Sequence, residues 1–372
     1  MDTMSGVTLW FSGWATFYLI SDRAGLALGD LALTSVTCVY AVGTLLAFAL
    51  WLTGVRAWPS IGSAEIIASI KASVLASVSH LLSIYALLLG GGVLAILIKC
   101  ACEPVVASVV NIMYYGGKGE SSFSKAKSMC LLPVVAGLAL AMLPGSAASG
   151  TSGGEVTPAG VLRWIASAQP HLLMQIQKKE VVNGTAVALL GVVVGALRSN
   201  ESRKLLHEKV LNASMANGAG SSCGGANQFS VMHCLSFMCC IPAAIWREKK
   251  SFPELLDFLV SDQGTVSAAP CGGLVLLVAA GIAFFLYNQA ACVLLLSRGP
   301  VTQAVLNALK TALFLGATAL YASVYGSSSG AATLVPVQIA GLVVAAAGAA
   351  GYIWLDNKGI AEVAALQSKK QV

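Results

Sequence analysis

The sequence predicts an all-α integral membrane protein with about ten transmembrane helices. Of its 372 residues, 57% are hydrophobic and 10% are charged, whereas about 25% of a soluble domain is charged. Its apolar stretches run for roughly 16 to 27 residues, long enough for a helix to cross a bilayer. They lack the period-two alternation of barrel strands, the other structure that satisfies its backbone groups in lipid. The helical fold is therefore predicted over the barrel.

Ten stretches have the length and apolarity of a transmembrane helix. The first is cut short by Asp22 and Arg23 and the sixth is brief, so a count of eight or nine stays open. The predicted spans are 7–22, 31–53, 72–90, 92–114, 128–147, 182–197, 229–246, 271–297, 299–325 and 334–355. We expect a first helical repeat over 1–147, a polar loop over 148–181, a second repeat over 182–355 and a cytosolic tail over 356–372.

The basic residues indicate the orientation of the chain. With Met1 in the cytosol, thirteen lysines and arginines fall in loops or the tail on the cytosolic side, and seven fall on the other side. Cytosolic loops carry the excess of positive charge, so both termini are predicted to be cytosolic. Membrane topology thus explains the net charge of +6, and no nucleic-acid partner is expected.

Composition also bears on cofactors and catalysis. The ten cysteines are scattered, mostly inside apolar stretches, and their spacing fits neither a zinc site nor a disulfide framework. The sequence shows no pairing of a nucleophile with a base and no glycine-rich phosphate loop. We therefore expect no metal, no cofactor and no enzymatic activity. A membrane enzyme or receptor that uses its buried charges in another way is the alternative from a different class.

Charged residues inside predicted spans indicate function, because a charge at bilayer depth is costly and needs a partner or a hydrated cavity. Lys99 and Glu103 are four residues apart and share one helix face. Pro104 follows directly and loosens the backbone bonding, so Glu103 and Pro104 are candidates for helix packing or gating. The structural alternative is an ion pair that only locks this helix to a neighbour.

The ninth predicted span carries a polar stripe on an otherwise apolar helix. Lys310 lies near its middle, where a lysine reaches the membrane surface with most difficulty. Gln303, Asn307 and Thr311 recur along the same stripe. We count Lys310, Asn307 and Thr311 among the candidate substrate-binding residues.

The third and eighth spans add polar side chains, His80 and Ser83 in the third and Tyr287 in the eighth. Each of them alone fits a satisfied core residue. Together with Lys99 and Lys310 they are suited to line one hydrated cavity. Hydroxyl and imidazole groups would hydrogen-bond a phosphate there, while the ammonium groups neutralise it.

A short break followed by a lysine-bearing helix occurs once in each half of the chain. Residues 90–92, all glycine, precede Lys99 by about two turns, and Arg298-Gly299-Pro300 precedes Lys310 by about three. Transporters built from internal repeats show this pattern around a site at the membrane midplane. An anionic solute is the substrate that two lysines favour.

At these residues the chain resembles the triose-phosphate transporter family, the plastid phosphate translocators of the drug/metabolite transporter superfamily. Residues 98–104, IKCACEP, are similar to its IKxxEP helix, with one extra residue between lysine and glutamate. Residues 285–313, FLYNQAACVLLLSRGPVTQAVLNALKTAL, are similar to its LYNQ and P(L/V)TxAVxNxxKR motifs.

The resemblance implies ten helices in two inverted five-helix repeats, and exchange by alternating access. The exchanged solutes would be inorganic phosphate and a phosphorylated small metabolite of the triose or sugar phosphate type. Lys99 and Lys310 would bind the phosphate with help from Tyr287. His80 and Ser83 occupy positions where the family places polar substrate contacts.

The sequence departs from the family pattern at two places. The THxIK helix reads AILIK at 95–99, so its threonine and histidine are absent. Thr311 stands where an arginine normally follows Lys310, which removes a bidentate phosphate clamp. The Lys-Thr pair is similar to one branch of the related nucleotide-sugar transporters. A nucleotide-sugar/nucleotide-monophosphate antiporter is therefore the alternative function.

The expected location follows these two functions, and is either an endomembrane of the endoplasmic reticulum or Golgi, or a plastid envelope membrane. Lys369 and Lys370 resemble a retrieval signal to the endoplasmic reticulum, with a solvated basic tail as the alternative. The expected partners are the phosphorylated substrate, inorganic phosphate and the lipid bilayer. A homodimer stays open.

Overall fold

The computed structural model of the chain is helical throughout its described part. It describes residues 8–17, 32–59, 62–86, 92–115, 125–141, 179–207, 224–249, 253, 272–325 and 336–370. Within these ranges the residues form helices and short connections, and no strand. The all-α prediction is thus confirmed for the described ranges.

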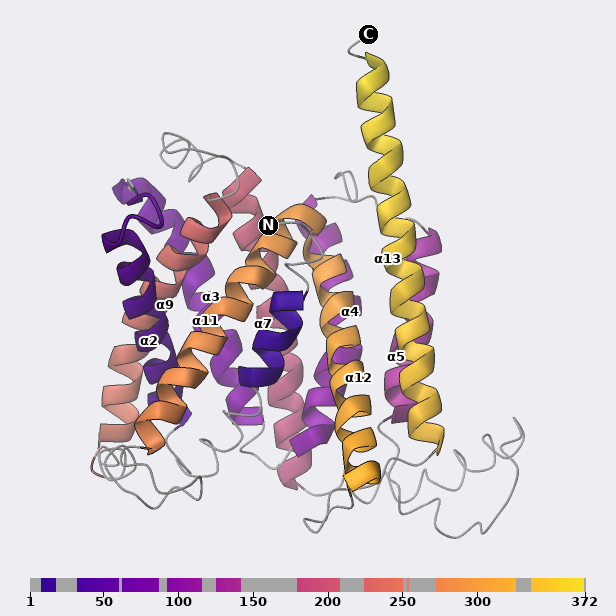
Figure 1. Cartoon of the computed structure of the whole chain (residues 1–372), viewed down its shortest axis with the longest axis horizontal. Helices are drawn as coiled ribbons and strands as arrows, with labels where there is room; N and C mark the ends of the chain where they lie inside the picture. The colour runs from indigo at the N-terminus through magenta and orange to yellow at the C-terminus, as the bar shows by residue number, and fades with distance from the viewer. Residues whose placement is uncertain are drawn as a thin grey trace. The chain divides into compact units, whose positions relative to one another are not determined.

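Each predicted span overlaps one helix of the structure (Figure 1). Residues 8–17 form the first helix. The labelled helices are α2 (Ala32–Leu52), α3 (Ser63–Ala86), α4 (Gly92–Tyr115), α5 (Lys125–Ala141), α7 (Lys179–His207), α9 (Gly224–Glu248), α11 (Gly272–Arg298), α12 (Pro300–Tyr325) and α13 (Pro336–Lys370).

Two helices run further than the sequence predicted. α7 continues to His207, so Arg198 and Arg203 lie on a helix rather than in the expected loop. The run from 196 to 207 holds neither glycine nor proline, and its leucine, arginine, lysine and glutamate favour a helix. α13 continues to Lys370, so the expected tail over 356–372 is helical up to that residue. Residues 148–178 of the expected polar loop lie outside the described residues.

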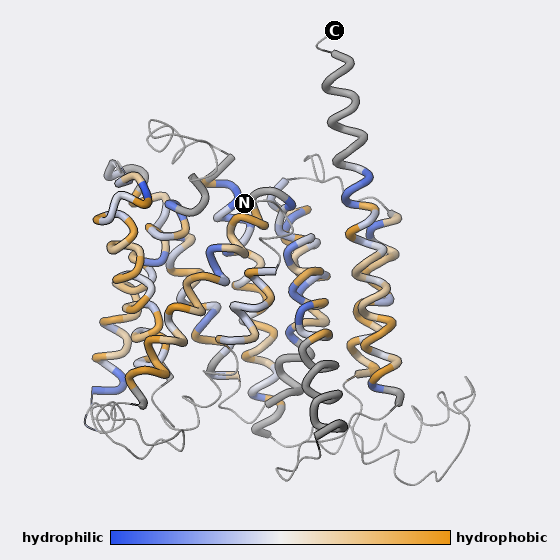
Figure 2. Tube along the Cα trace, viewed as in Figure 1, coloured by the Kyte–Doolittle hydropathy of each residue, from blue (hydrophilic) through white to orange (hydrophobic). Residues whose placement is uncertain are grey.

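Within the described ranges, six helices are long and apolar enough to cross a membrane, and apolar residues dominate along them (Figure 2). The chain is thus a multi-pass membrane protein. The count of ten spans and the inverted repeats stay predictions. The six candidate segments are Leu33–Leu52, Ile66–Ser83, Val182–Leu205, Asn227–Glu248, Leu274–Leu295 and Gln338–Gly359.

Packing divides the chain into two compact units that do not follow the order of the sequence. Unit 1 consists of Met1–Tyr85 and Val194–Pro300, and unit 2 of Ala86–Val193 and Val301–Val372. Helix α7 therefore contributes one part to each unit. The predicted repeats, 1–147 and 182–355, are defined by topology rather than by packing, and they too stay predictions.

In unit 1, α2 packs against α9 and α11 (Figure 1). The Glu248 carboxylate at the end of α9 accepts the backbone N–H groups of Leu33 and Thr34, at 2.9 and 2.7 Å. Amides in the first turn of a helix have no partner within the helix. Glu248 therefore caps α2 from another helix, at the end where a negative charge is favourable.

In unit 2, α5 and α13 run side by side (Figure 1). Their contact continues into a core that α4 and α12 share, with Ala101, Leu138, Val305 and Ala345 all buried. The apolar sides of these four helices thus face one another, which sets the position of the polar residues that α4 and α12 carry.

A buried polar network ties three helices of unit 2 together. Lys127 of α5 pairs with Asp356 of α13, with Nζ and Oδ1 2.7 Å apart. The hydroxyl of Thr302 on α12 donates to the other oxygen of Asp356 at 3.1 Å. Because both carboxylate oxygens have partners, the charge of Asp356 is compensated where it is buried.

Candidate functional site

Helix α4 carries a proline in its middle stretch. Pro104 has no N–H, so the carbonyl of Cys100 four residues earlier receives no helical hydrogen bond from it. The helix continues beyond this point, and the Ser108 hydroxyl donates to the Pro104 carbonyl at 2.6 Å. The helix therefore lacks one backbone hydrogen bond beside Glu103, and the role of Glu103 and Pro104 in helix packing or gating stays a prediction.

Two polar contacts join α4 to α12. The Asn307 amide donates to Glu103 Oε2 at 2.6 Å. One turn away, the Cys100 thiol donates to Thr311 Oγ1 at 3.2 Å, and the Thr311 hydroxyl donates to the Asn307 carbonyl at 3.1 Å. Asn307 and Thr311, which the sequence proposed for substrate binding, are therefore engaged between the helices.

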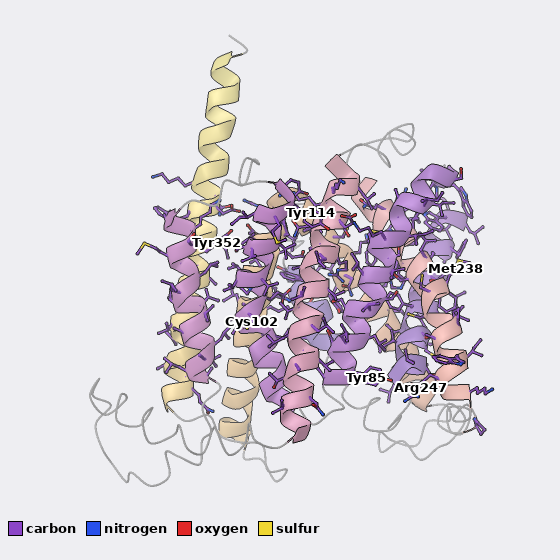
Figure 3. The ribbon with its side chains drawn as sticks, turned by 180° about the vertical axis from the view of Figure 1, so that it is seen from behind. Tyr85, Cys102, Tyr114, Met238, Arg247 and Tyr352 are labelled. Atoms are coloured by element: carbon purple, nitrogen blue, oxygen red, sulfur yellow. The ribbon has the colours of Figure 1, made fainter. Side chains whose placement is uncertain are left out.

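Both lysines predicted from the sequence lie at this crossing. Lys310 is only 4% exposed, and Lys99 is half-buried. Lys310 interacts electrostatically with both Lys99 and Glu103. One carboxylate thus accompanies two ammonium groups inside an apolar bundle, where a charge must be compensated. Figure 3 shows the neighbouring Cys102 along the middle stretch of α4, with Tyr114 nearer its end.

His80 and Tyr287 lie in unit 1, within a cluster of aromatic rings. The His80 ring centroid is 4.6 Å from that of Phe284, and the Tyr287 centroid is 5.4 Å from Phe284 and 5.5 Å from Phe17. Such tilted and edge-on contacts hold the two rings in fixed orientations. The Ser83 hydroxyl donates to a carbonyl one turn earlier at 2.8 Å, which leaves its oxygen as an acceptor.

The predicted site residues thus form two groups, one in each compact unit. The group in unit 2 consists of Lys99, Glu103, Pro104, Asn307, Lys310 and Thr311. The group in unit 1 consists of His80, Ser83 and Tyr287. Their convergence on one cavity stays a prediction.

Arg198 is a charged residue that reasoning from the sequence did not select. It lies on α7 within the candidate span Val182–Leu205. It interacts electrostatically with Tyr287, Tyr40 and Cys292 in unit 1. The helix-favouring run around it was the signal that would have placed this arginine on a helix rather than in a loop.

The described residues show no arrangement for a metal ion. None of their His, Cys, Asp and Glu side chains form a group of three or more that could hold one. The cysteines within the described ranges are free thiols, and Cys100 is buried beside the lysines.

The apolar helices and the charged group between α4 and α12 define a multi-pass membrane protein with a polar site inside its bundle. The model of the Triose-phosphate Transporter family matches residues 180–352, slightly less than half of the chain. This match confirms the resemblance over that range, which includes Tyr287 and Lys310 but not Lys99. The matched family is one of transporters, which supports a solute transporter rather than an enzyme.

The other comparisons concern the whole chain. No curated protein matches it by sequence. A crystal structure of a protein that is 15% identical matches 96% of this chain and 98% of its own, with a TM-score of 0.57. At this identity the likeness shows a common fold alone.

Proposed function

We propose that this chain is a secondary active antiporter that exchanges inorganic phosphate for a phosphorylated small metabolite of the triose or sugar phosphate type. The proposal includes alternating access, in which the site opens to one side of the membrane at a time. The weakened backbone bonding at Pro104 supports it, because a helix that bends there can move against its neighbours.

The carrying observation is the pair of lysines at the crossing of α4 and α12. Lys310 is buried and interacts electrostatically with both Lys99 and Glu103. Ammonium groups held close together in an apolar bundle repel each other. A phosphate dianion between them would offset that repulsion and accept hydrogen bonds from both.

Unit 1 would supply the groups that recognise the rest of the substrate. We propose that Tyr287, His80 and Ser83 donate or accept hydrogen bonds there. The guanidinium of Arg198, which interacts electrostatically with Tyr287, would add a further positive charge to this group of residues. The identity of the phosphorylated metabolite would depend on these contacts rather than on the lysines.

Thr311 favours the alternative function, a nucleotide-sugar/nucleotide-monophosphate antiporter of the endoplasmic reticulum or Golgi. Its hydroxyl lies between Cys100 and the Asn307 carbonyl, so it replaces none of the hydrogen bonds that an arginine would give a phosphate. An endomembrane location would follow from this alternative, and a plastid envelope location from the first function.

Counterflow in proteoliposomes separates the two functions. Vesicles are loaded with phosphate and offered labelled triose phosphate or phosphoenolpyruvate, or they are loaded with UMP or GMP and offered nucleotide sugars. We expect uptake with phosphate inside. Uptake only with nucleotides inside would select the alternative, and no trans-stimulation by any phosphate compound would reject both functions.

Variants of the lysines test the site. We expect Lys99→Ala and Lys310→Ala each to reduce exchange to background, because each variant removes one of the two ammonium groups from the proposed site. Lys310→Met, which keeps most of the side-chain volume, should do the same. The amount of inserted protein should stay equal to that of the wild type.

A lysine outside the proposed site provides the control. Lys358 is exposed near the end of the last candidate span, 5.8 Å from the centre of the Trp354 ring. Lys358→Ala should retain exchange. Unimpaired exchange in both Lys99→Ala and Lys310→Ala would reject the assignment of these residues to the site.

A further inference from the structure

Two of the side chains in contact between α4 and α12 each follow one of the lysines. Cys100 follows Lys99, and Thr311 follows Lys310. They are 4% and 3% exposed, and the thiol hydrogen points to Thr311 Oγ1 at 3.2 Å. Because the Thr311 hydroxyl hydrogen goes to the Asn307 carbonyl, the threonine oxygen acts as the acceptor. The contact is thus a hydrogen bond from the Cys100 thiol to Thr311 that joins α4 to α12 where they cross.

Cys100 and Thr311 also occupy matching places in the repeated sequence pattern. When Lys99 is aligned with Lys310, Cys100 falls on Thr311. Contact between two equivalent residues is what a two-fold axis produces at the point where it passes through an interface.

The second contact gives the direction of the two helices. Glu103 comes three residues after Cys100, whereas its partner Asn307 comes four residues before Thr311. α4 and α12 therefore pass each other in opposite chain directions. Opposite directions together with contact between equivalent residues place a local two-fold axis at Cys100 and Thr311, which supports the predicted inverted repeat.

We propose that Cys100 and Thr311 are positioning residues, whose contact keeps Lys99 and Lys310 in register across this axis. The inference rests on the proposed role of the two lysines in phosphate binding. Consecutive residues of a helix are about 100° apart, so each lysine leaves its helix beside the contact. The pair then acts by setting the distance between the two ammonium groups. Thr311 is thus a residue that positions Lys310, instead of the substrate-binding residue that the sequence predicted.

An engineered disulfide tests the contact without any transport assay. Thr311→Cys puts a second thiol opposite Cys100, within the reach of a disulfide if the two backbones are as close as the hydrogen bond implies. Mild oxidation of the purified protein should link residues 100 and 311, as detected by mass spectrometry of the joined peptides. The same variant combined with Cys100→Ala is the control, and it should not link position 311 to Cys102.

Phosphate homoexchange in proteoliposomes tests the positioning role. Cys100→Ala and Thr311→Val remove the bond, and we expect each to raise the KM for phosphate about fivefold, the loss of roughly one hydrogen bond. The maximal rate should stay within about twofold. Cys100→Ser and Thr311→Ser keep a donor and an acceptor, so both should restore the wild-type KM.

The outcomes separate this inference from the proposed function. No link between residues 100 and 311 would overturn the contact. An unchanged KM in Cys100→Ala and Thr311→Val, or a fall in maximal rate alone, would overturn the positioning role. Absence of phosphate homoexchange in the wild type, with the disulfide still formed, would reject phosphate as the substrate while leaving the two-fold contact in place.

Discussion

Gly43 of α2 faces a histidine that leaves no room for a side chain. The His233 ring of α9 is 2% exposed and packs 4.7 Å from Tyr40 and 5.4 Å from Phe285, measured between ring centroids. A Cβ on Gly43 would overlap Nε2 of this imidazole. Because rings confine the histidine on its other sides, it has little freedom to move away.

We therefore expect Gly43→Ala to destabilise the protein by about 1–3 kcal/mol, the usual cost of overpacking. Gly359→Ala is the control, because a Cβ at that position of α13 meets no atom within 4 Å. It should be neutral or slightly stabilising, since alanine favours a helix more than glycine does. Thermal stability of the detergent-solubilised variants measures both. Equal melting temperatures for the two variants would contradict this account of Gly43.

Single residues differ in how far the sequence reveals their role. Lys99 and Lys310 were predictable because a charge inside an apolar run is visible in its own segment. The partner of Glu103 was not, since Asn307 lies 204 positions away in the chain. The same separation hid the bond between Cys100 and Thr311, for which the sequence suggested a buried apolar thiol and a substrate ligand.

At the scale of elements, α5 and α13 approach each other through their backbones. A Cβ on Gly341 would lie 2.7 Å from the backbone nitrogen of Ala141 and 2.8 Å from Cβ of Leu140. Gly137 on α5 meets the backbone of α13 in the same way. Small residues let membrane helices come this close, and the dispersion contacts between them hold the pair together.

Gly341→Ala should accordingly separate α5 from α13 and lower the melting temperature in detergent, at a cost of about 1–3 kcal/mol. Gly351→Ala on the same helix is the matched control, because its Cβ meets only the Cys130 sulfur, at an ordinary 3.5 Å. We expect the control to keep the wild-type melting temperature. A loss of stability in Gly351→Ala as large as in Gly341→Ala would refute the close approach.

The ends of the helices were the least predictable elements. α7 extends to His207 because its polar residues favour a helix as much as apolar ones do. Hydropathy, which sets the ends of the predicted spans, falls at Arg198 while the helix continues. Arg198 was therefore assigned to a loop, and its electrostatic interaction with Tyr287 was missed.

For the whole molecule, the excess of basic residues on one side predicts that both termini are cytosolic. The loop over 148–181 would then face the lumen of a secretory compartment, and the segment around Asn212 would face the cytosol. Residues 148–178 and the segment around Asn212 lie outside the described residues. The sequons at Asn183 and Asn200 fall within the candidate span Val182–Leu205, out of reach of the glycosylation enzyme.

Glycosylation tests this topology. Glu155→Asn creates a sequon with Thr157 in the expected lumenal loop. Expressed in the endoplasmic reticulum, this variant should gain a glycan that endoglycosidase removes. The wild type, with its sequon at Asn212, should gain none. Glycan on Asn212 in the wild type, identified by peptide mass spectrometry, would reverse the predicted orientation.

The sequence by itself determined that this is a helical membrane protein with charges inside its spans, because hydropathy and charge are properties of each segment alone. It also determined the repeated break-and-lysine pattern. Only the tertiary structure decided that α4 and α12 meet at Cys100 and Thr311, that Glu103 binds Asn307, and that Arg198 interacts electrostatically with Tyr287. These interactions join residues far apart in the chain, and packing of whole helices sets which of them meet.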